Sequence, residues 1–377
     1  MVESGTDVRL VEGLAERADL TVLARRIAGG VEISREPGHP VRTELGPASR
    51  AGFAVATLRA VLARPRWDHV LVQGYGAAAL AANLAGRLTG TPVTMLVCSP
   101  VESYYRCRRD HPEPGKPFRR AELFGLVALA RLNARLGRGY VVLSEYLAGV
   151  VRSHGTNGPV DVVPVYGVDT DRFKPTTAPK AELRRGIGMA PDGALIFFSS
   201  RVTPEKDAET LLDALGRLRA EGRDVCLLHR SGGYREFGRL AAARGLGHAV
   251  IATDAVHPER ELPASYQASD LCVQASRDEG LGFSPLESLA CEVPVVATAV
   301  GGLRETILDG ETGWSCPAGD AVAMARAIAD ALDHPEEARR RAARGRELVR
   351  RRFERRAAFD RLFEVLGAAA APRSREP

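Results

Sequence analysis

The sequence predicts an α/β protein with two Rossmann-like, doubly wound domains, and three observations support this prediction. Short apolar runs alternate with amphipathic stretches along almost the whole chain, a pattern typical of βαβ units with parallel sheets. The length of 377 residues suits two domains at roughly 150 residues each. Residues 162–175, rich in turn formers and proline, divide the chain. We therefore expect two domains that face each other across a cleft, where ligands of such folds bind.

The predicted strands follow from the apolar runs, four in the first half of the chain and five in the second. They are residues 20–24, 69–73, 93–98, 140–144, 194–199, 225–229, 249–252, 271–275 and 293–297. The predicted N-terminal domain covers residues 1–165, and the predicted C-terminal domain covers 176–350. In residues 351–377 we expect a helix over 353–366, followed by a disordered tail.

The start of the chain is unusual for a doubly wound domain. Residues 1–6 lead directly into a helical pattern, and no strand with a glycine turn comes before it. Two explanations stay open: the first strand is absent from this protein, or the true start codon lies upstream of the assigned one.

Composition and charge exclude several classes of protein. The 52 basic and 47 acidic residues leave a net charge of +5, and no basic block alternates with aromatic residues, so nucleic acid is not an expected partner. The six cysteines are scattered without a C-x-x-C pair, as expected for free thiols. No apolar run approaches ~18 residues, and the N-terminus lacks a signal-peptide core. The sequence predicts a cytoplasmic protein and leaves its oligomeric state open.

Residues 277–302 form the most informative segment for chemistry. Glu279 lies on a glycine-rich loop after a predicted strand, and Glu287 lies eight positions later, in the first turn of a predicted helix. Ser284 is a candidate N-cap for that helix with Pro285 at its first position. Ser284 and Glu287 have the spacing of a capping box, so spacing alone favours a structural role for Glu287.

The pair Gly301 and Gly302 follows the next predicted strand and opens a helical pattern. A glycine turn at a helix N-terminus offers free N–H groups and a positive dipole end to an anion. An ordinary strand-to-helix turn explains two glycines equally well, so this feature alone does not establish a site.

Taken together, these residues resemble the retaining glycosyltransferases of family 4, which have the GT-B fold. The run E-G-x-G-x-x-P-x-E from Glu279 to Glu287, with the following strand and Gly-Gly, carries most of the resemblance. Several motifs in the expected order are far more specific than any one of them. Four further stretches agree in sequence and order: residues 165–173, 200–207, 262–270, and 310–314 with 317–320.

The resemblance implies transfer of a sugar from a nucleotide sugar, UDP- or GDP-linked, to an acceptor hydroxyl with retention, and it implies no metal or other cofactor. Glu287 would bind the ribose hydroxyls, and Glu279 would contact the transferred sugar. Arg201 and Lys206 would hold the diphosphate and stabilise its developing charge, helped by N–H groups at Gly301 and Gly302. The donor-binding residues would also include Gly282, Phe283 and Ser284. Neither glutamate is expected to act as a covalent nucleophile. The resemblance also implies that residues 1–165 form the acceptor-side domain and residues 176–350 the donor-binding domain, and that the helix over 353–366 crosses back to the first domain, as in relatives.

Some residues depart from the family pattern, and other functions stay open. Cys98 stands where many family members carry a histidine, and the turn at 229–233 differs from the usual glycine-rich turn near the base. The acceptor and the base are therefore undetermined. The alternatives are a retaining glycosyl phosphorylase of the same fold, separated by its use of free phosphate, and a sugar-nucleotide-binding protein with little catalysis.

Three further patterns favour structural interpretations. Residues 74–79 have a G-x-G-x-x-A shape, but no acidic residue follows at the ribose-binding distance, which favours helix packing over a dinucleotide site. Residues 169–171 form a D-x-D inside the linker pattern, so we expect no metal there. A basic amphipathic helix over 117–138 could contact an anionic membrane, but core packing with a solvated arginine face is the favoured interpretation.

Overall fold

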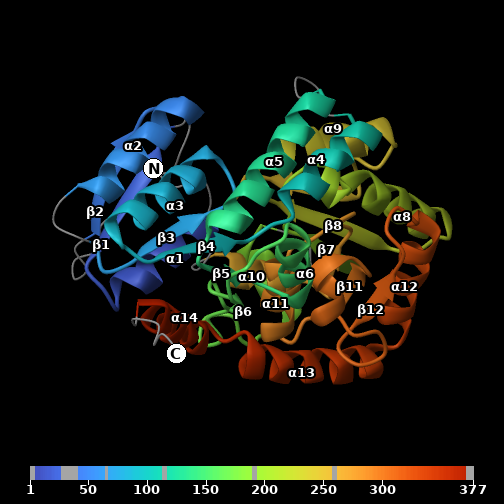
Figure 1. Cartoon of the computed structure of the whole chain (residues 1–377). Helices are drawn as coiled ribbons and strands as arrows, with labels where there is room; N and C mark the ends of the chain where they lie inside the picture. The colour runs from blue at the N-terminus through green and yellow to red at the C-terminus, as the bar shows by residue number, and fades with distance from the viewer. Residues whose placement is uncertain are drawn as a thin grey trace. The chain divides into compact units, whose positions relative to one another are not determined.

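In the computed structural model the chain forms two units, which are described separately (Figure 1). The structure describes residues 5–26, 41–63, 67–112, 117–188, 193–256 and 261–370. Unit 1 consists of Met1–Glu102, Arg119–Gly167 and Arg355–Pro377, and unit 2 consists of Ser103–Phe118 and Val168–Glu354. Each unit is therefore assembled from segments that are distant in the sequence.

The strands of unit 1 are all parallel and form two sheets rather than one. In the first sheet β1 (Leu20–Arg25) pairs with β2 (Val41–Gly46). The second sheet has the order β3-β4-β5-β6, with β3 (Val70–Gln73), β4 (Val93–Val97), β5 (Gly139–Val142) and β6 (Val160–Val162). The two inner strands, β4 and β5, are completely buried, whereas the strands at the sheet edges are partly exposed. The two most buried strands of this sheet are thus ones that the apolar runs predict.

The helices of unit 1 pack around these sheets. They are α1 (Gly5–Ala15), α2 (Arg50–Leu62), α3 (Ala77–Thr89), α5 (Arg120–Leu136), α6 (Glu145–Ser153) and α14 (Arg355–Ala370). The last helix is joined to the first: an added Cβ at Gly13 would lie 2.1 Å from the Phe359 ring, and Arg17 forms a 3.0 Å ion pair with Asp360. The glycine of α1 therefore makes room for the aromatic ring of α14.

Unit 2 contains one six-stranded parallel sheet with the order β12-β11-β10-β7-β8-β9. Its strands are β7 (Ala194–Phe198), β8 (Val225–Arg230), β9 (Val250–Thr253), β10 (Leu271–Gln274), β11 (Val295–Thr298) and β12 (Trp314–Cys316). The chain moves outward from β7 in one direction and then from β10 in the other. This reversal places a topological switch point beyond the carboxyl ends of β7 and β10, where open α/β sheets bind ligands.

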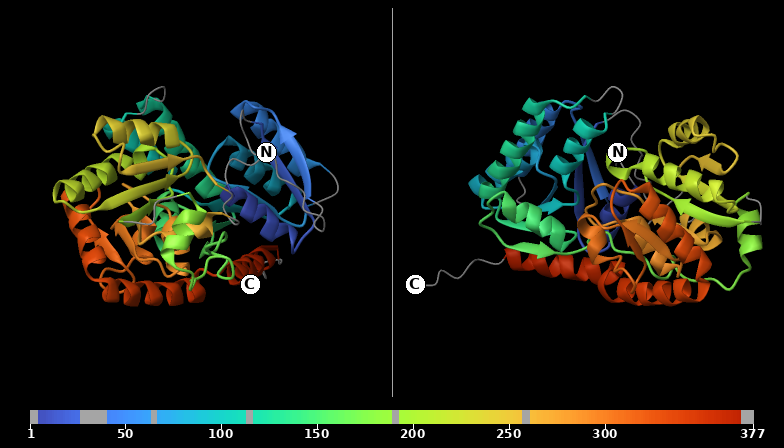
Figure 2. Two further views of the ribbon diagram at one scale, coloured as in Figure 1. Left: turned by 180° about the vertical axis from the view of Figure 1, so that it is seen from behind. Right: turned by 90° about the vertical axis from the view of Figure 1, so that its right-hand side faces the viewer.

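Helices cover both faces of this sheet, as the views in Figures 1 and 2 show. The helices are α4 (Val101–Asp110, in unit 2 from Ser103), α7 (Lys180–Gly186), α8 (Ala208–Ala220), α9 (Tyr234–Ala243), α10 (Leu262–Ala268), α11 (Phe283–Ala290), α12 (Ala321–Asp333) and α13 (Pro335–Arg352), with the short 3-10 helices η1 (Pro204–Lys206) and η2 (Gly301–Glu305). One continuous core joins α8, α9 and α12 to the sheet. On the described residues, no helix is both long and apolar enough to cross a bilayer.

All nine predicted strands are present, with ends within two residues of the prediction, and three further strands were not predicted. β2 is polar and mostly exposed, so it lacks the apolar pattern of a strand. β6 and β12 each have three residues, too few to establish a period. β6 also ends at residue 162, where the sequence indicated the start of the linker.

Candidate functional site

The switch point of unit 2 brings two loops together, one after β7 and one after β10. Lys206, at the end of η1, extends its ammonium to the Glu279 carboxylate, with 2.5 Å between Nζ and Oε2. Both side chains are largely buried, at 13% and 10% exposed. Burying a charge is costly unless the charge is paired and hydrogen-bonded. Each of these two side chains therefore depends on the other to remain charged in its buried position.

Polar residues of β10 and its loop hold the Glu279 carboxylate in one position. Its Oε2 accepts hydrogen bonds from Ser276 Oγ at 3.1 Å and from Gln274 Nε2 at 3.3 Å. Ser200 Oγ, after β7, donates in turn to Gln274 Oε1 at 2.9 Å. The carboxylate is therefore fixed by both loops before any ligand binds.

Gly301 and Gly302 allow the loop after β11 to approach the Glu279 loop closely. An added Cβ at Gly301 would lie 2.1 Å from the carbonyl oxygen of Glu279, and one at Gly302 would lie 2.3 Å from that of Gly280. Gly301 also has a φ of +45°, which favours glycine. The N–H of Gly302 donates to the Glu279 carbonyl at 2.9 Å, so the expectation that it is free for an anion is not met.

The helix that carries Glu287 begins differently from the sequence interpretation. Gly282, with a φ of +91°, is the N-cap of α11, and Phe283 is the first helical residue. Ser284 therefore lies inside the first turn, where its hydroxyl is 2.6 Å from Ser199 Oγ and 3.0 Å from Tyr266 OH. The prediction of a Ser284 N-cap and a Ser284–Glu287 capping box is wrong, because the left-handed glycine starts the helix earlier.

Glu287 is buried, at 4% exposed, and faces a tyrosine of α10. Tyr266 OH donates to Glu287 Oε2 at 2.9 Å. Burial, and then the neighbouring Glu287 charge, raises the pKa of Tyr266 well above its usual value, so the phenol stays protonated as a donor. A buried carboxylate oriented by a neutral donor and no longer explained as a helix cap is a candidate binding group.

The two expected diphosphate-binding cations lie in different surroundings. Lys206 is buried against Glu279, whereas Arg201, just beyond β7, is exposed at the surface of the described structure. A third cation was not predicted: Arg277 forms a 2.8 Å ion pair with Asp207, the N-cap of α8. The structure therefore joins Lys206 and Glu279 directly and leaves Arg201 outside that contact.

Tyr104 of α4 also lies beside Lys206 in this site. The Nζ of Lys206 lies 6.0 Å from the centroid of its ring. Burial, followed by the charge of Glu279, raises the pKa of Tyr104 well above its usual value, while a hydrogen bond from the Gly280 backbone N–H acts in the opposite direction. No local pattern around Tyr104 indicates this contact, since its partners come from a distant segment.

In unit 1, Cys98 follows β4 at the position where the family resemblance suggests a histidine. Its Sγ is 3.1 Å from Tyr166 OH, which also accepts a 3.2 Å hydrogen bond from Gln73 Nε2 at the end of β3. Gln73 and Cys98 lie at the carboxyl ends of the paired strands β3 and β4, the functional edge of a parallel sheet, and Tyr166 reaches them from the segment after β6. All six cysteines are free thiols.

Two of the patterns interpreted as structural have structural partners. Asn133 of α5 donates to the carbonyl oxygen of Tyr75 at 2.8 Å, which ties the loop before α3 to a neighbouring helix. Asp169 Oδ1 accepts from the backbone N–H groups of Asp171 and Arg172, both at 3.1 Å, so it closes a turn. Within the described residues no group of three or more His, Cys, Asp or Glu side chains could hold a metal ion.

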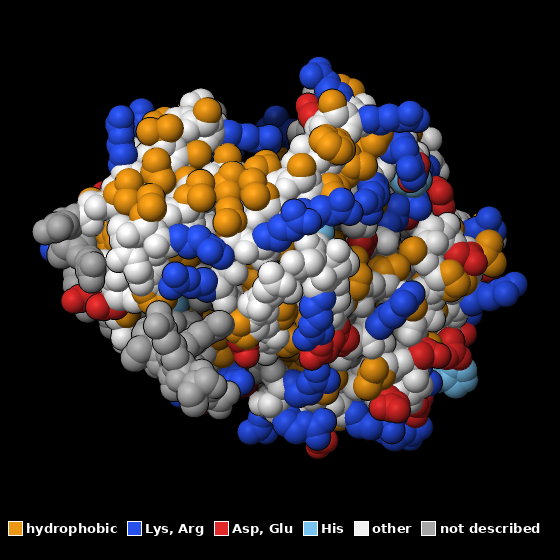
Figure 3. Space-filling view, viewed as in Figure 1, with side chains coloured by type: hydrophobic (Ala, Val, Ile, Leu, Met, Phe, Trp, Pro, Cys, Tyr) orange, Lys and Arg blue, Asp and Glu red, His pale blue; other side chains and the backbone are white. Residues whose placement is uncertain are grey.

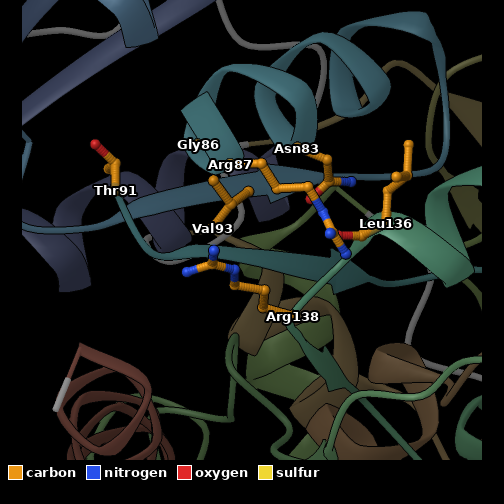
Figure 4. Close-up of a pocket in the computed structure, with 7 residues that line it drawn as sticks. All are labelled: Asn83, Gly86, Arg87, Thr91, Val93, Leu136 and Arg138. Atoms are coloured by element: carbon orange, nitrogen blue, oxygen red, sulfur yellow. The ribbon is translucent and has the colours of Figure 1, made fainter. Parts of the chain in front are cut away.

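Two surface hollows lie among the described residues. An open hollow of about 510 Å³ lies beside the Gly301–Gly302 turn and is lined in part by Arg304, Cys316 and Pro317. A second, much tighter hollow in unit 1 lies among Asn83, Arg87 and Arg138 (Figure 4). It adjoins the residues before β4 and β5, at the amino ends of the strands, so it lies away from the edge where such sheets bind ligands.

Two family models match the chain, and between them they cover most of it. The "Glycosyl transferase 4-like domain" matches residues 8–166, and "Glycosyl transferases group 1" matches residues 179–348. A 2-deoxystreptamine glucosyltransferase of Streptomyces kanamyceticus is 30% identical over 336 residues, covering 86% of this chain and 84% of the relative. A GDP-mannose-dependent alpha-(1-6)-phosphatidylinositol monomannoside mannosyltransferase of Mycolicibacterium smegmatis is 36% identical over 209 residues, 53% of this chain and only 54% of that relative.

Solved structures share the fold over nearly the whole chain. The Anabaena protein Alr3699/HepE, solved with UDP-glucose, has a TM-score of 0.75 at 16% identity and covers 97% of this chain and 98% of its own. Sucrose-phosphate synthase of Thermosynechococcus elongatus has a TM-score of 0.78 at 22% identity, with coverages of 96% and 92%. The predicted α/β fold class of GT-B type is thus confirmed, and the chain belongs to the group 1 glycosyl transferases, with a first half of the glycosyl transferase 4-like type.

Proposed function

We propose that this protein is a retaining glycosyltransferase of family 4 that moves a hexose from a UDP- or GDP-sugar to an acceptor hydroxyl. The observation that carries the proposal is the buried Lys206–Glu279 pair at the switch point of the unit 2 sheet. A cation for a diphosphate and a carboxylate for sugar hydroxyls stand side by side there. The GT-B fold and the transferase family support the same assignment.

The proposed roles follow from the position of each side chain. Glu287, oriented by Tyr266, would accept hydrogen bonds from the ribose hydroxyls. Glu279, held by Ser276 and Gln274, would bind hydroxyls of the transferred sugar. Lys206 would exchange part of its contact with Glu279 for the diphosphate, and the exposed Arg201 would add a second positive charge. The remaining donor contacts would come from the loop and turn residues Gly282, Phe283, Ser284 and Gly301, whereas the N–H of Gly302 is already bonded to the Glu279 carbonyl.

The reaction needs charge stabilisation rather than a protein nucleophile. The bond between the anomeric carbon and the diphosphate oxygen breaks while the acceptor oxygen bonds to that carbon from the same face. The acceptor proton passes to the departing phosphate oxygen, and a nucleoside diphosphate is released. A fixed donor aimed at the developing charge is worth about 3 kcal/mol in the transition state, which is the contribution assigned to Lys206.

The relatives support a nucleotide-sugar donor and a hydroxyl acceptor but differ in detail. One is named for GDP-mannose and a phosphatidylinositol monomannoside, another for D-inositol 3-phosphate and a third for 2-deoxystreptamine. The structural neighbour from Anabaena was solved with UDP-glucose. We therefore propose that the acceptor presents a ring hydroxyl and leave both bases as candidates.

The test is nucleoside diphosphate release from UDP-glucose, UDP-GlcNAc and GDP-mannose, with inositol phosphate and 2-deoxystreptamine as acceptors. We expect nucleoside diphosphate release from donors of one base only, and no turnover in Glu279→Gln. The product linkage, determined by NMR, should have the same anomeric configuration as the donor sugar. Turnover that requires free phosphate instead of a nucleotide would establish the phosphorylase alternative. Nucleotide-sugar binding without turnover in every combination would favour the binding-protein alternative.

A further inference from the structure

Three neighbouring helices of unit 1 carry most of the exposed large hydrophobic side chains among the described residues. Helix α3 packs against both α2 and α5. Ten large hydrophobic side chains are exposed in the described part of the chain, and six of them belong to these helices. The six are Val55, Leu62, Leu84, Leu88, Phe124 and Leu132. The other four are divided among β2, α4, β9 and α12, so the exposed apolar surface is concentrated on α2, α3 and α5.

The six side chains lie on the outer face of these helices, which we call the α2–α3–α5 face. The two residues on each helix are seven, four or eight positions apart, which places them on the same side of that helix. The opposite sides of α2 and α3 pack inward, with Val61, Ala82 and Ala85 in a buried cluster. Figure 3 shows hydrophobic side chains gathered over α2 and α3, with Lys and Arg side chains around them. Leu88 and Phe124 are the most exposed of the six, at 78% and 76%.

The charged residues of the same three helices are almost all basic. They are Arg50 and Arg59 of α2, Arg87 of α3, and Arg120, Glu122, Arg131 and Arg135 of α5, and all seven are exposed. Six arginines against one glutamate give these helices a net charge of +5, which equals the net charge of the whole chain. Of the 52 basic and 47 acidic residues, the other 46 of each sign therefore cancel. The excess positive charge is thus carried by the helices that also expose apolar side chains.

Helix α5 shows how this face differs from the sequence interpretation, which favoured core packing with a solvated arginine face. Part of the helix does pack inward, because Ala130 and Ala134 are buried. Its solvated side carries Phe124 and Leu132 together with Arg131. The solvated side of α5 is therefore amphipathic and not a face of arginines alone.

The charge and the apolar side chains together indicate what covers this face. A second copy of the chain would bring the same positive charge against it, and like charges across an interface are unfavourable. A nucleic acid would pair with the arginines through its phosphates but would leave the aliphatic side chains in water. An anionic lipid surface offers phosphates to the arginines and acyl chains to the apolar residues, which is the combination that interfacial helices of this kind bind.

We propose that the α2–α3–α5 face docks on an anionic phospholipid membrane. Leu88 and Phe124 insert between the lipid headgroups and the acyl chains, and the arginines contact the lipid phosphates. Basic residues near an anionic membrane strengthen binding, and added salt screens their contribution. The inference is independent of the proposed function, because it concerns the surface of three helices of unit 1 and needs no sugar donor.

The test is co-sedimentation of the unchanged protein with two kinds of vesicle. One contains phosphatidylglycerol and phosphatidylcholine in equal parts, and the other contains phosphatidylcholine alone. We expect binding to the anionic vesicles that weakens as salt is added, and binding to the phosphatidylcholine vesicles that is at least about tenfold weaker. Phe124→Ser should weaken binding to the anionic vesicles by at least about tenfold, and Arg131→Gln by about fivefold.

Matched variants in unit 2 control for the loss of any exposed side chain. Ile251→Ser removes an exposed isoleucine of β9, and Arg239→Gln removes an exposed arginine of α9. Both should leave vesicle binding unchanged. Because Phe124 is 76% exposed, the melting temperature of Phe124→Ser should equal that of the unchanged protein. In Phe124→Trp, which keeps an aromatic ring at this position, fluorescence emission should shift to shorter wavelength with the anionic vesicles only.

Three results would overturn the inference. The first is no binding of the unchanged protein to the anionic vesicles, or equal binding to both kinds. The second is unchanged vesicle binding by Phe124→Ser, which would place the contact on another surface. The third is a dimer in light scattering without vesicles that Phe124→Ser dissociates, because a second copy would then cover the face. None of these results bears on nucleotide binding, so the proposed function is tested separately.

Discussion

Replacing Lys206 with methionine should destabilise unit 2, because it leaves the Glu279 carboxylate buried without its cation. Glu279 keeps the hydrogen bonds from Ser276 and Gln274, and the pair is only 13% and 10% exposed, so water can replace little of the lost attraction. Removing one partner of such a pair costs about 3–5 kcal/mol in the free energy of unfolding. For unit 2, with about 200 residues, the melting temperature should fall by roughly 6–20 °C.

A double-mutant cycle measured by urea unfolding tests this reasoning. In Lys206→Met/Glu279→Gln the second change removes the orphaned charge, so the double variant should be at least about 2 kcal/mol more stable than the sum of the single costs predicts. Additive costs would refute the conclusion that the two side chains act as a pair. Lys180→Met is the matched control, since Lys180 is 46% exposed and Asp270 keeps Arg184 as a partner; it should cost less than about 1 kcal/mol.

Three further predictions concern packing, hydrogen bonding and pH. Gly302→Ala should lower the free energy of unfolding by about 1–3 kcal/mol and weaken donor binding, because its Cβ would lie 2.3 Å from the carbonyl oxygen of Gly280. The control is Gly238→Ala in α9, where an added Cβ meets open space, and its free energy of unfolding should not fall. Tyr266→Phe should lower the unfolding free energy by about 1–3 kcal/mol and weaken nucleotide binding in titrations, since Glu287 loses a buried donor; unchanged affinity would contradict this. Burial lowers the pKa of His229 from 6.5 to about 4, so the unfolded chain binds a proton at a higher pH than the folded chain does. The free energy of unfolding should therefore fall by up to about 3 kcal/mol as the pH drops from 6.5 to 4. Melting curves of His229→Phe should lack this dependence on pH.

The buried part of the fold could be predicted from the sequence because buried parallel strands are continuous apolar runs. β4 and β10, for example, are buried along their whole length and coincide closely with the predicted runs. β2 could not be predicted, since four of its six residues are exposed and polar or small side chains interrupt any alternation. The separation of the unit 1 strands into two sheets also lies beyond local patterns, because pairing depends on contacts between distant segments.

In the candidate site, the residues found from sequence are those whose signal is local. Glu279, Glu287 and the glycines lie in one short segment, where spacing and glycine content mark an unusual loop. The partners of these residues could not be found in the same way. Tyr104, which lies beside Lys206, belongs to a helix about 100 residues before it in the sequence. Nothing in the Gly-Gly pattern shows that the Glu279 carbonyl accepts a hydrogen bond from the N–H of Gly302. The capping-box spacing even suggested the wrong partner for Ser284.

We propose above all that the carboxyl edge of the unit 2 sheet binds a nucleotide through Glu287. The most direct measurement is calorimetric titration of UDP and GDP into the unchanged protein and into Glu287→Gln. Glutamine keeps the size of the side chain and an oxygen that accepts from Tyr266, so stability should change little. We expect one of the two nucleotides to bind and the variant to bind it at least about tenfold more weakly, the equivalent of about 1.4 kcal/mol for a lost charged hydrogen bond. Binding of neither nucleotide, or equal affinity in the variant, would contradict the account.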